Sequence, residues 1–174
     1  MIFRLIYVLL ISVCGNKASI HEETRISLRV WPTDLDLNFH LTNSRYFKFM
    51  DLSRYQHIIT TGVWKLITRQ KLRPVLGGAA IRFRRPVPLF MKVNVTTRIL
   101  GYDKKWIYIA HSVASKKQVY SKAVLRMTFI NHKGKMAMDA IFLNLEQSSF
   151  VWPNNPALSD TTDLNKAFHS IEFN

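Results

Sequence analysis

The sequence is short of several residue types, and each shortage excludes a class of protein. A single cysteine, Cys14, excludes an internal disulfide and any zinc site built from several cysteines. Six glycines and six prolines among 174 residues, beside 48% hydrophobic residues, are typical of a globular chain rather than a disordered one. A chain of this length can form one domain with a substantial core.

Acidic residues are also scarce: 11 Asp and Glu against 25 Lys and Arg give a formal charge of +14. This charge favours an anionic partner, such as nucleic acid, an anionic membrane, an acidic carrier protein or a phosphate-bearing ligand like coenzyme A. A soluble surface that is merely basic is the alternative. The basic residues fall in small groups: Arg82, Arg84 and Arg85, then Lys104 and Lys105, then Lys116 and Lys117. Because the sequence has no long basic tract, zinc finger or P-loop, nucleic acid is the weakest option.

A long hydrophobic run is missing as well. The uncharged stretch from Leu5 to Asn16 would rise only about 18 Å as a helix, whereas the hydrocarbon core of a bilayer is roughly 30 Å thick. Two alternatives to a transmembrane span are a signal peptide, since Arg4 precedes an apolar run, and a short helix that lies on a membrane or packs on the domain. We favour the helix. We expect an apolar segment over 1–20, one domain over 21–146 and a polar extension over 147–174.

Hydrophobic periodicity predicts a strand, a buried helix and then four more strands. Apolar and polar residues alternate from Thr24 to Trp31, which indicates a half-buried strand. The spacing becomes helical from Asn43, the expected N-cap, to Gly62, the expected stop, and a shorter helix follows over 63–71. Strands joined by tight hairpins are expected over 76–87, 92–100, 104–115 and 118–131. Because only these strands can cover the long helix, we expect an α+β domain with one antiparallel sheet curled around it.

The stretch TDLDLNFHLTNSRYF, residues 33–47, places polar side chains at alternate positions just before the long helix. Asp36, Asn38 and His40 are separated by apolar residues. The carboxylate can simply hold a turn through hydrogen bonds to nearby main chain, as Asp34 also could. A metal site is a weak alternative, because one His and one or two Asp residues are a poor ligand set. The third explanation is an active site.

The run DLNFH at 36–40 resembles the D-x-N-x-H run of plant acyl-carrier-protein thioesterases. The ten-residue spacing from Asp36 to Tyr46 resembles that of 4-hydroxybenzoyl-CoA thioesterase-type enzymes. With RVWPTDLD and the later ILGYDKKWIYI, residues 24–131 are similar to hotdog-fold acyl thioesterases, most of all to bacterial relatives of thioesterase superfamily member 6. Thr42 departs from the pattern, since it replaces the first of two usual asparagines, and the chain has one hotdog unit where the plant enzymes have two.

This resemblance implies a single hotdog domain, with a long central helix wrapped by a curved antiparallel sheet, that hydrolyses an acyl thioester without a cofactor or metal. Asp36 would be the nucleophile or general base, Asn38 would orient water or the carbonyl, and His40 would orient the carboxylate or shuttle a proton. Amides at the helix start near Asn43 would stabilise the oxyanion. The residues expected to bind the substrate, an acyl-CoA or acyl-carrier protein, are Tyr46, Arg82, Arg84, Arg85, Lys116 and Lys117.

The same resemblance implies a homodimer or a dimer of dimers. Coenzyme A chemistry favours the cytoplasm, and the apolar residues 1–15 favour peripheral contact with the inner membrane face. Two rival functions are considered. An (R)-specific enoyl-CoA hydratase would carry D-x-N-P-x-H, which is not reproduced because Phe39 follows Asn38 and His40 comes next. A non-catalytic, membrane-associated acyl-binding protein would suit the apolar N-terminus and the basic charge.

Overall fold

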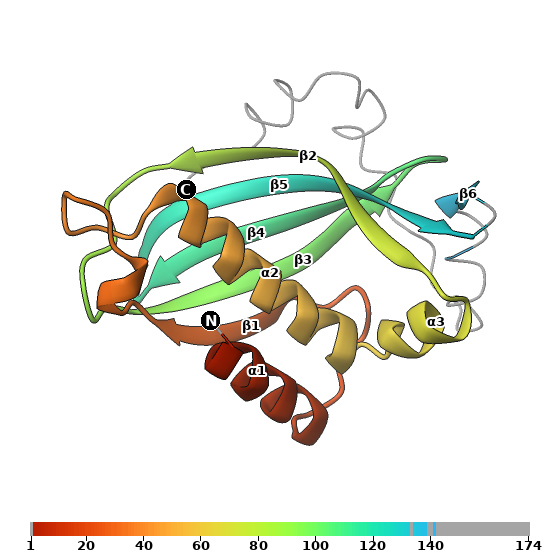
Figure 1. Cartoon of the computed structure of the whole chain (residues 1–174), viewed down its shortest axis with the longest axis horizontal. Helices are drawn as coiled ribbons and strands as arrows, with labels where there is room; N and C mark the ends of the chain where they lie inside the picture. The colour runs from red at the N-terminus through yellow and green to blue at the C-terminus, as the bar shows by residue number, and fades with distance from the viewer. Residues whose placement is uncertain (1, 133, 139–140, 142–174) are drawn as a thin grey trace.

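The computed structural model describes residues 2–132, 134–138 and 141 of the chain (Figure 1). The predicted polar extension over 147–174 lies outside these residues. The helices are α1 (Ile2–Cys14), a short 3-10 helix (Pro32–Asp34), α2 (Asn43–Thr60) and α3 (Val63–Arg69). The strands are β1 (Thr24–Arg29), β2 (Arg73–Phe83), β3 (Lys92–Tyr102), β4 (Ile107–Ser115), β5 (Gln118–Asn131) and the short β6 (Gly134–Lys135).

All strand pairs of the described sheet are antiparallel, and their order is β1-β3-β4-β5-β2, with β6 beside β5. The sheet curls around α2, which confirms the predicted α+β hotdog architecture (Figure 1). Tight hairpins join β3 to β4 and β4 to β5, as predicted. The predicted hairpin between β2 and β3 is wrong, because β2 pairs with β5 at the far edge. The connection instead turns away after β2, and its Val87 carbonyl accepts the Leu41 amide at 2.9 Å.

The core lies between α2 and β3. Alternate β3 residues face the helix, and Val93, Val95 and Thr97 are completely buried, as the period-2 pattern predicted. The helix meets this face with Phe49 and Met50, which are also completely buried. Burying one such large side chain contributes about 1.5–3 kcal/mol to folding.

The buried face of α2 is more polar than its apolar spacing suggested. Tyr55, one of the large apolar residues at helical spacing in this segment, is 45% exposed. Ser53, His57 and Thr60 are buried in its place, at the i, i+4 and i+7 positions that share one helical face. Each of these polar side chains forms at least one hydrogen bond there, to Thr97, Thr24 and the Gln56 carbonyl respectively.

Helix α1 packs along α2 (Figure 1). Its Val8 and Ser12 are completely buried, and Leu5 and Ile11 contact the core. The Ser12 hydroxyl donates to the Val8 carbonyl at 2.6 Å, which satisfies the one polar side chain on this buried stripe. Of the described helices, none combines the length and apolarity that crossing a bilayer requires. The expected short helix is therefore present and packs on the domain.

Candidate active site

Residues 36–40 form a tight turn on the surface between the 3-10 helix and α2. Leu35 and Leu41 pair across its base, and the Asp36 amide donates to the His40 carbonyl at 2.9 Å. The Phe39 amide closes the turn by donating to the Asp36 carbonyl at 3.1 Å, and Phe39 has a positive φ of 59°. The side chain of Leu37 is 98% exposed. The turn therefore presents its side chains to the outside of the protomer.

The two oxygens of the Asp36 carboxylate differ in their hydrogen bonds. Its Oδ1 accepts the main-chain amides of Asn38 at 2.9 Å and His40 at 3.2 Å, which is the turn-holding geometry considered from the sequence. Its Oδ2 has no hydrogen-bond partner within the part of the chain that the structure describes. One oxygen thus fixes the carboxylate, and the other remains available to a ligand.

Asn38 and His40 contact the Asp36 carboxylate with their main-chain amides and not with their side chains. Asn38 is exposed, whereas His40 is half-buried and pairs with Pro88 in an isolated β-bridge. The structure shows no hydrogen bond that joins either side chain to the Asp36 carboxylate in the described residues. Their predicted roles in orienting water or moving a proton therefore stay predictions.

Helix α2 begins beside this turn. Its N-cap is Thr42, which has extended backbone angles (φ −66°, ψ 146°), so the expectation that Asn43 is the cap is wrong by one residue. Asn43 is instead the first helical residue, and the Thr42 hydroxyl contacts that of Ser44 at 3.1 Å. The first amides of a helix have no intrahelical acceptor and lie at the positive end of its dipole. Only Leu41 and Thr42 separate these amides from the turn along the chain.

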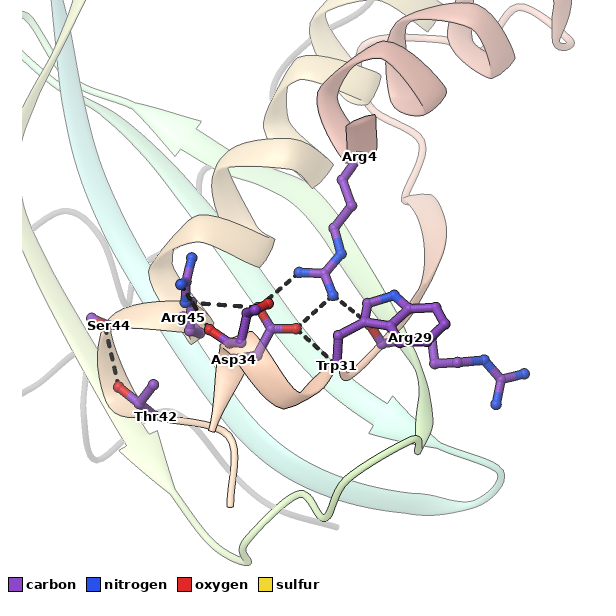
Figure 2. A network of polar contacts seen from close by, with 8 residues as sticks. Arg4, Arg29, Trp31, Asp34, Thr42, Ser44 and Arg45 are labelled. Carbon is purple, nitrogen blue, oxygen red and sulfur yellow. Dashed lines mark hydrogen bonds and ion pairs between the residues drawn. The ribbon is translucent and has the colours of Figure 1, made fainter. Parts of the chain in front are cut away.

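Asp34 organises the base of the turn, and sequence reasoning missed this role. Its side chain is 1% exposed and accepts Arg4 Nη1 at 2.9 Å, Arg4 Nη2 at 2.5 Å and the Trp31 amide at 2.9 Å (Figure 2). Arg45, in the first turn of α2, places Nε 3.7 Å from Oδ1. The Asp34 carbonyl also accepts the Thr42 amide at 3.0 Å. Asp34 therefore ties together α1, the 3-10 helix and the start of α2.

The charge of Asp34 is maintained by its partners. Burial alone would raise the pKa of this carboxyl, but the hydrogen bonds from Arg4 and Trp31 and the charges of Arg4 and Arg45 together hold the pKa below its ordinary value. A sequence signal for this network did exist. Arg4 is the only charged residue in the apolar run over 2–16, so it requires a partner wherever that run is packed against the domain.

The predicted substrate-binding residues separate into two sets. Tyr46 is 2% exposed and packs edge-on against Phe83, with ring centroids 5.0 Å apart, and burial raises its pKa to about 12. It belongs to the hydrophobic core of the domain. The second set of predicted substrate-binding residues is basic and exposed: Arg82, Arg84, Arg85, Lys116 and Lys117.

These basic residues occupy one end of the sheet. The main-chain amides of Arg84 and Arg85 both donate to the Tyr120 carbonyl, at 2.8 and 3.4 Å. Both arginines therefore lie beside the start of β5 and the preceding turn, which carries Lys116 and Lys117. The next few residues after Arg85 pair with the turn, through Val87 to Leu41 and Pro88 to His40. The structure thus brings the basic end of β2 next to the Asp36 turn.

A second polar cluster is buried beneath the C-terminal half of α2. His57 and His111 are each 3% exposed; His57 Nδ1 lies 3.0 Å from Thr24 Oγ1, and His111 Nδ1 lies 3.1 Å from Thr97 Oγ1. Burial lowers the pKa of His57 to about 4, and burial together with the charge of Arg54 lowers that of His111 well below the ordinary range. Both imidazoles are therefore neutral at pH 7.

We expect this cluster to make the protein sensitive to mild acid. Below about pH 6.5, His57 becomes protonated in the unfolded state, but in the folded state it stays neutral until about pH 4. The free energy of unfolding therefore decreases as the pH falls through that window. His57 alone would lower the free energy of unfolding by on the order of 3 kcal/mol between those limits. Urea unfolding at pH 7.0, 6.0, 5.0 and 4.5 measures the decline. A flat profile would contradict the neutral buried state, and His132→Gln, at an exposed histidine, should leave the profile unchanged.

Comparison with known proteins agrees with the fold. The family model of the thioesterase-like superfamily matches residues 30–159. Protein THEM6 of Xenopus laevis is 33% identical over 96 residues, which are 55% of this chain and 46% of that protein. Thioesterase lcsJ of Purpureocillium lilacinum is 27% identical over 174 residues, covering 86% of this chain and 54% of that protein. The chain thus spans about half the length of these curated relatives.

Among solved structures, the YbaW probable thioesterase from Escherichia coli superposes with a TM-score of 0.66 at 21% identity, covering 71% of this chain and 96% of YbaW. This likeness concerns the fold. The family match extends over the Asp36 turn, all of α2 and strands β2 to β6. The chain belongs to the thioesterase-like superfamily.

Proposed function

We propose that this protein hydrolyses an acyl thioester, carried by coenzyme A or an acyl-carrier protein, at the Asp36 turn. The observation that supports this most is the position of the Asp36 carboxylate. It is fixed through Oδ1, has an available Oδ2, and lies six residues before Thr42, the N-cap of α2. A carboxylate held without full neutralisation suits either nucleophilic attack or activation of water.

The start of α2 supplies the other requirement of the reaction. Attack on a thioester carbonyl creates an oxyanion, which is stabilised by main-chain amides that point at it before the reaction begins. The amides of Asn43 and Ser44 begin α2 at the positive end of the helix dipole, whereas the Arg45 amide already donates to the Thr42 carbonyl at 2.9 Å. We propose that Asn38 orients the water or the thioester carbonyl and that His40 orients the carboxylate or moves a proton.

The basic residues beside the turn suit the phosphates of coenzyme A. Arg82, Arg84 and Arg85 lead from β2 toward the Asp36 turn, and Lys116 and Lys117 form the adjacent hairpin. Arginine and lysine bind phosphate oxygens through charge-assisted hydrogen bonds. An acidic carrier protein would contact the same surface, so both carriers are included in the test. Coenzyme A chemistry suits the cytoplasm.

The direct test measures thiol release from acyl-CoAs. The purified protein would be incubated with aliphatic and aromatic acyl-CoAs and with acyl-carrier protein, and free thiol would be followed over time. We expect saturable release with at least one substrate class. Tight acyl-CoA binding without release would favour the non-catalytic acyl-binding protein, and water addition to crotonyl-CoA would favour the hydratase.

We further propose a homodimer joined through β2. This 11-residue strand pairs with β5 on one side, and no described strand covers its other side. Val75, Leu76 and Phe83 are 38%, 46% and 40% exposed along it. A long exposed strand edge with apolar side chains is a template for pairing with another chain. Antiparallel pairing of two β2 strands would satisfy the edge in both copies and permits a further pairing of dimers.

We expect Leu76→Lys to convert the dimer to a monomer, because the new charge would be buried against the partner strand. Light scattering after size-exclusion chromatography gives the mass of each form. Trp64→Lys is the matched control, since Trp64 is 52% exposed but lies on α3 and not on the strand. A monomeric parent protein, or a dimer that survives Leu76→Lys, would refute pairing through β2.

Peripheral membrane contact through α1 is proposed as well. The face of α1 turned away from the domain carries apolar residues that are 48–82% exposed: Ile2, Phe3, Ile6, Tyr7, Leu10 and Val13. An apolar helical face on a protein of charge +14 suits an anionic bilayer surface. We expect the protein to sediment with anionic vesicles and Phe3→Ser/Leu10→Ser to lose most of that binding. Equal sedimentation of the two forms would contradict contact through α1.

A further inference from the structure

A cavity lies beneath the C-terminal half of α2, away from the Asp36 turn. Its volume is about 40 Å³, and its walls are largely apolar, with Ile99 of β3, Ile109 of β4 and Met127 of β5 among them. Arg54, His57 and Thr97 also line it. His57 stands roughly 20 Å along α2 from Asn43, so the cavity is a separate feature from the proposed active site.

One polar atom at this cavity makes no hydrogen bond of good geometry, although the Ile20 main chain interacts with the same imidazole. His57 is 3% exposed, and its Nε2 has no hydrogen-bond partner in residues 2–132, 134–138 and 141. The other ring nitrogen, Nδ1, is engaged with Thr24 Oγ1 at 3.0 Å. A buried polar atom without a partner is costly, and native structures retain one chiefly where a water, ion or ligand completes it.

The remaining polar groups at the cavity are already paired. Arg54 forms an ion pair with Asp51 and contacts His111 Nε2 at 3.3 Å. The Thr97 hydroxyl is 2.6 Å from Ser53 Oγ and 3.1 Å from His111 Nδ1. An anionic ligand would therefore lose its hydration without meeting an unpaired positive charge. Only the His57 Nε2 position calls for a new hydrogen bond.

We propose that this cavity binds the end of an aliphatic chain that carries a hydroxyl group. The apolar walls accept the hydrocarbon, and the hydroxyl meets His57 Nε2. A hydroxyl suits either tautomer of the imidazole, because it can donate a hydrogen bond to a bare nitrogen or accept one from an N–H. The volume corresponds to about three water-sized positions, which admits a chain end rather than a bulky ring system.

The test compares ligands that differ only in their polar end. 1-Hexanol, n-heptane and hexanoate would be titrated into the full-length protein, with the histidine ring nitrogens followed by ¹⁵N NMR and stability followed by thermal unfolding. We expect 1-hexanol to bind saturably, to shift Nε2 of His57 more than any other histidine nitrogen, and to bind about fivefold more tightly than n-heptane, as one net hydrogen bond predicts.

Two variants distinguish the cavity from other sites. His57→Phe keeps a planar ring but removes Nε2, so 1-hexanol and n-heptane should then bind equally. Asp36→Asn alters only the proposed active site and should leave binding of 1-hexanol unchanged, so failure of one proposal is separable from failure of the other. The proposal is overturned if 1-hexanol leaves the His57 signal in place, if hexanoate binds more tightly than 1-hexanol, or if a resident water on Nε2 is not displaced. If His57→Phe fails to fold, the comparison of 1-hexanol, n-heptane and hexanoate on the parent protein still tests whether a hydroxyl binds at His57.

Discussion

Asp36→Asn should lower the turnover of the preferred thioester by about three orders of magnitude without unfolding the protein. The amide cannot attack a carbonyl or accept a proton from water, and loss of a general base or nucleophile typically costs 10²–10⁴ in rate. The Asn oxygen can still accept the Asn38 and His40 amides that Asp36 Oδ1 accepts now. The turn therefore keeps its hydrogen bonds and loses only the charge.

Thiol release and thermal unfolding should be measured on the same preparation of this variant. Glu23→Gln provides the matched control, because it removes an exposed carboxylate whose ion pair with Arg25 spans 3.8 Å at the surface. We expect that control to retain full turnover. Parent-like thiol release by a correctly folded Asp36→Asn protein would exclude Asp36 from the reaction.

Asp34→Asn should destabilise the fold by about 3–5 kcal/mol at pH 7. The substitution is nearly isosteric, but it leaves the Arg4 guanidinium, with a side chain only 14% exposed, without its charged partner. Removing one member of a buried ion pair typically costs this much, because the remaining charge stays desolvated. Arg45 would lose a weaker contact at 3.7 Å. Urea unfolding at constant pH gives the difference directly.

A second substitution shows whether the cost arises from the stranded charge. Arg4→Met combined with Asp34→Asn should recover part of the lost stability, since it removes the guanidinium that has lost its carboxylate partner. The recovery is only partial because the guanidinium also lies over the Phe49 ring, with Cζ 5.0 Å from the centroid, and that contact is lost too. A loss below about 1 kcal/mol in Asp34→Asn, the range of exposed pairs, would contradict a stabilising role for the network. Because the Asp34 side chain also faces Arg45 in the first turn of α2, we expect turnover to fall without any contact between Asp34 and substrate.

Much of the fold followed from local patterns. The alternation in β1 and β3 and the helical spacing up to Gly62 each concern residues that pack within one element, and the structure confirms them. The position of β2 at the far edge was missed, because it depends on pairing with β5 some 45 residues later. The polar residues on the buried face of α2 were missed for a related reason. Ser53 and His57 are acceptable there only because Thr97 and Thr24 lie opposite them.

The candidate site was predicted unevenly for the same physical reasons. The Asp36 turn and the neighbouring helix start are contiguous in sequence, so their proximity could be predicted from the run DLNFH and the helical pattern after it. The Arg4–Asp34 pair joins positions 30 residues apart, and only the packing of α1 on α2 reveals it. The side-chain roles of Asn38 and His40 require a bound substrate and stay predictions.

The central claim is that the Asp36 carboxylate and the first amides of α2 act on one carbonyl group. A crystal structure with an acyl-CoA analogue that has a methylene between sulfur and carbonyl, and therefore resists hydrolysis, tests this most directly. We predict the carbonyl carbon within about 3.5 Å of an Asp36 oxygen and the carbonyl oxygen about 3 Å from a first-turn amide of α2. An analogue bound with its carbonyl remote from Asp36 of every subunit would contradict the account.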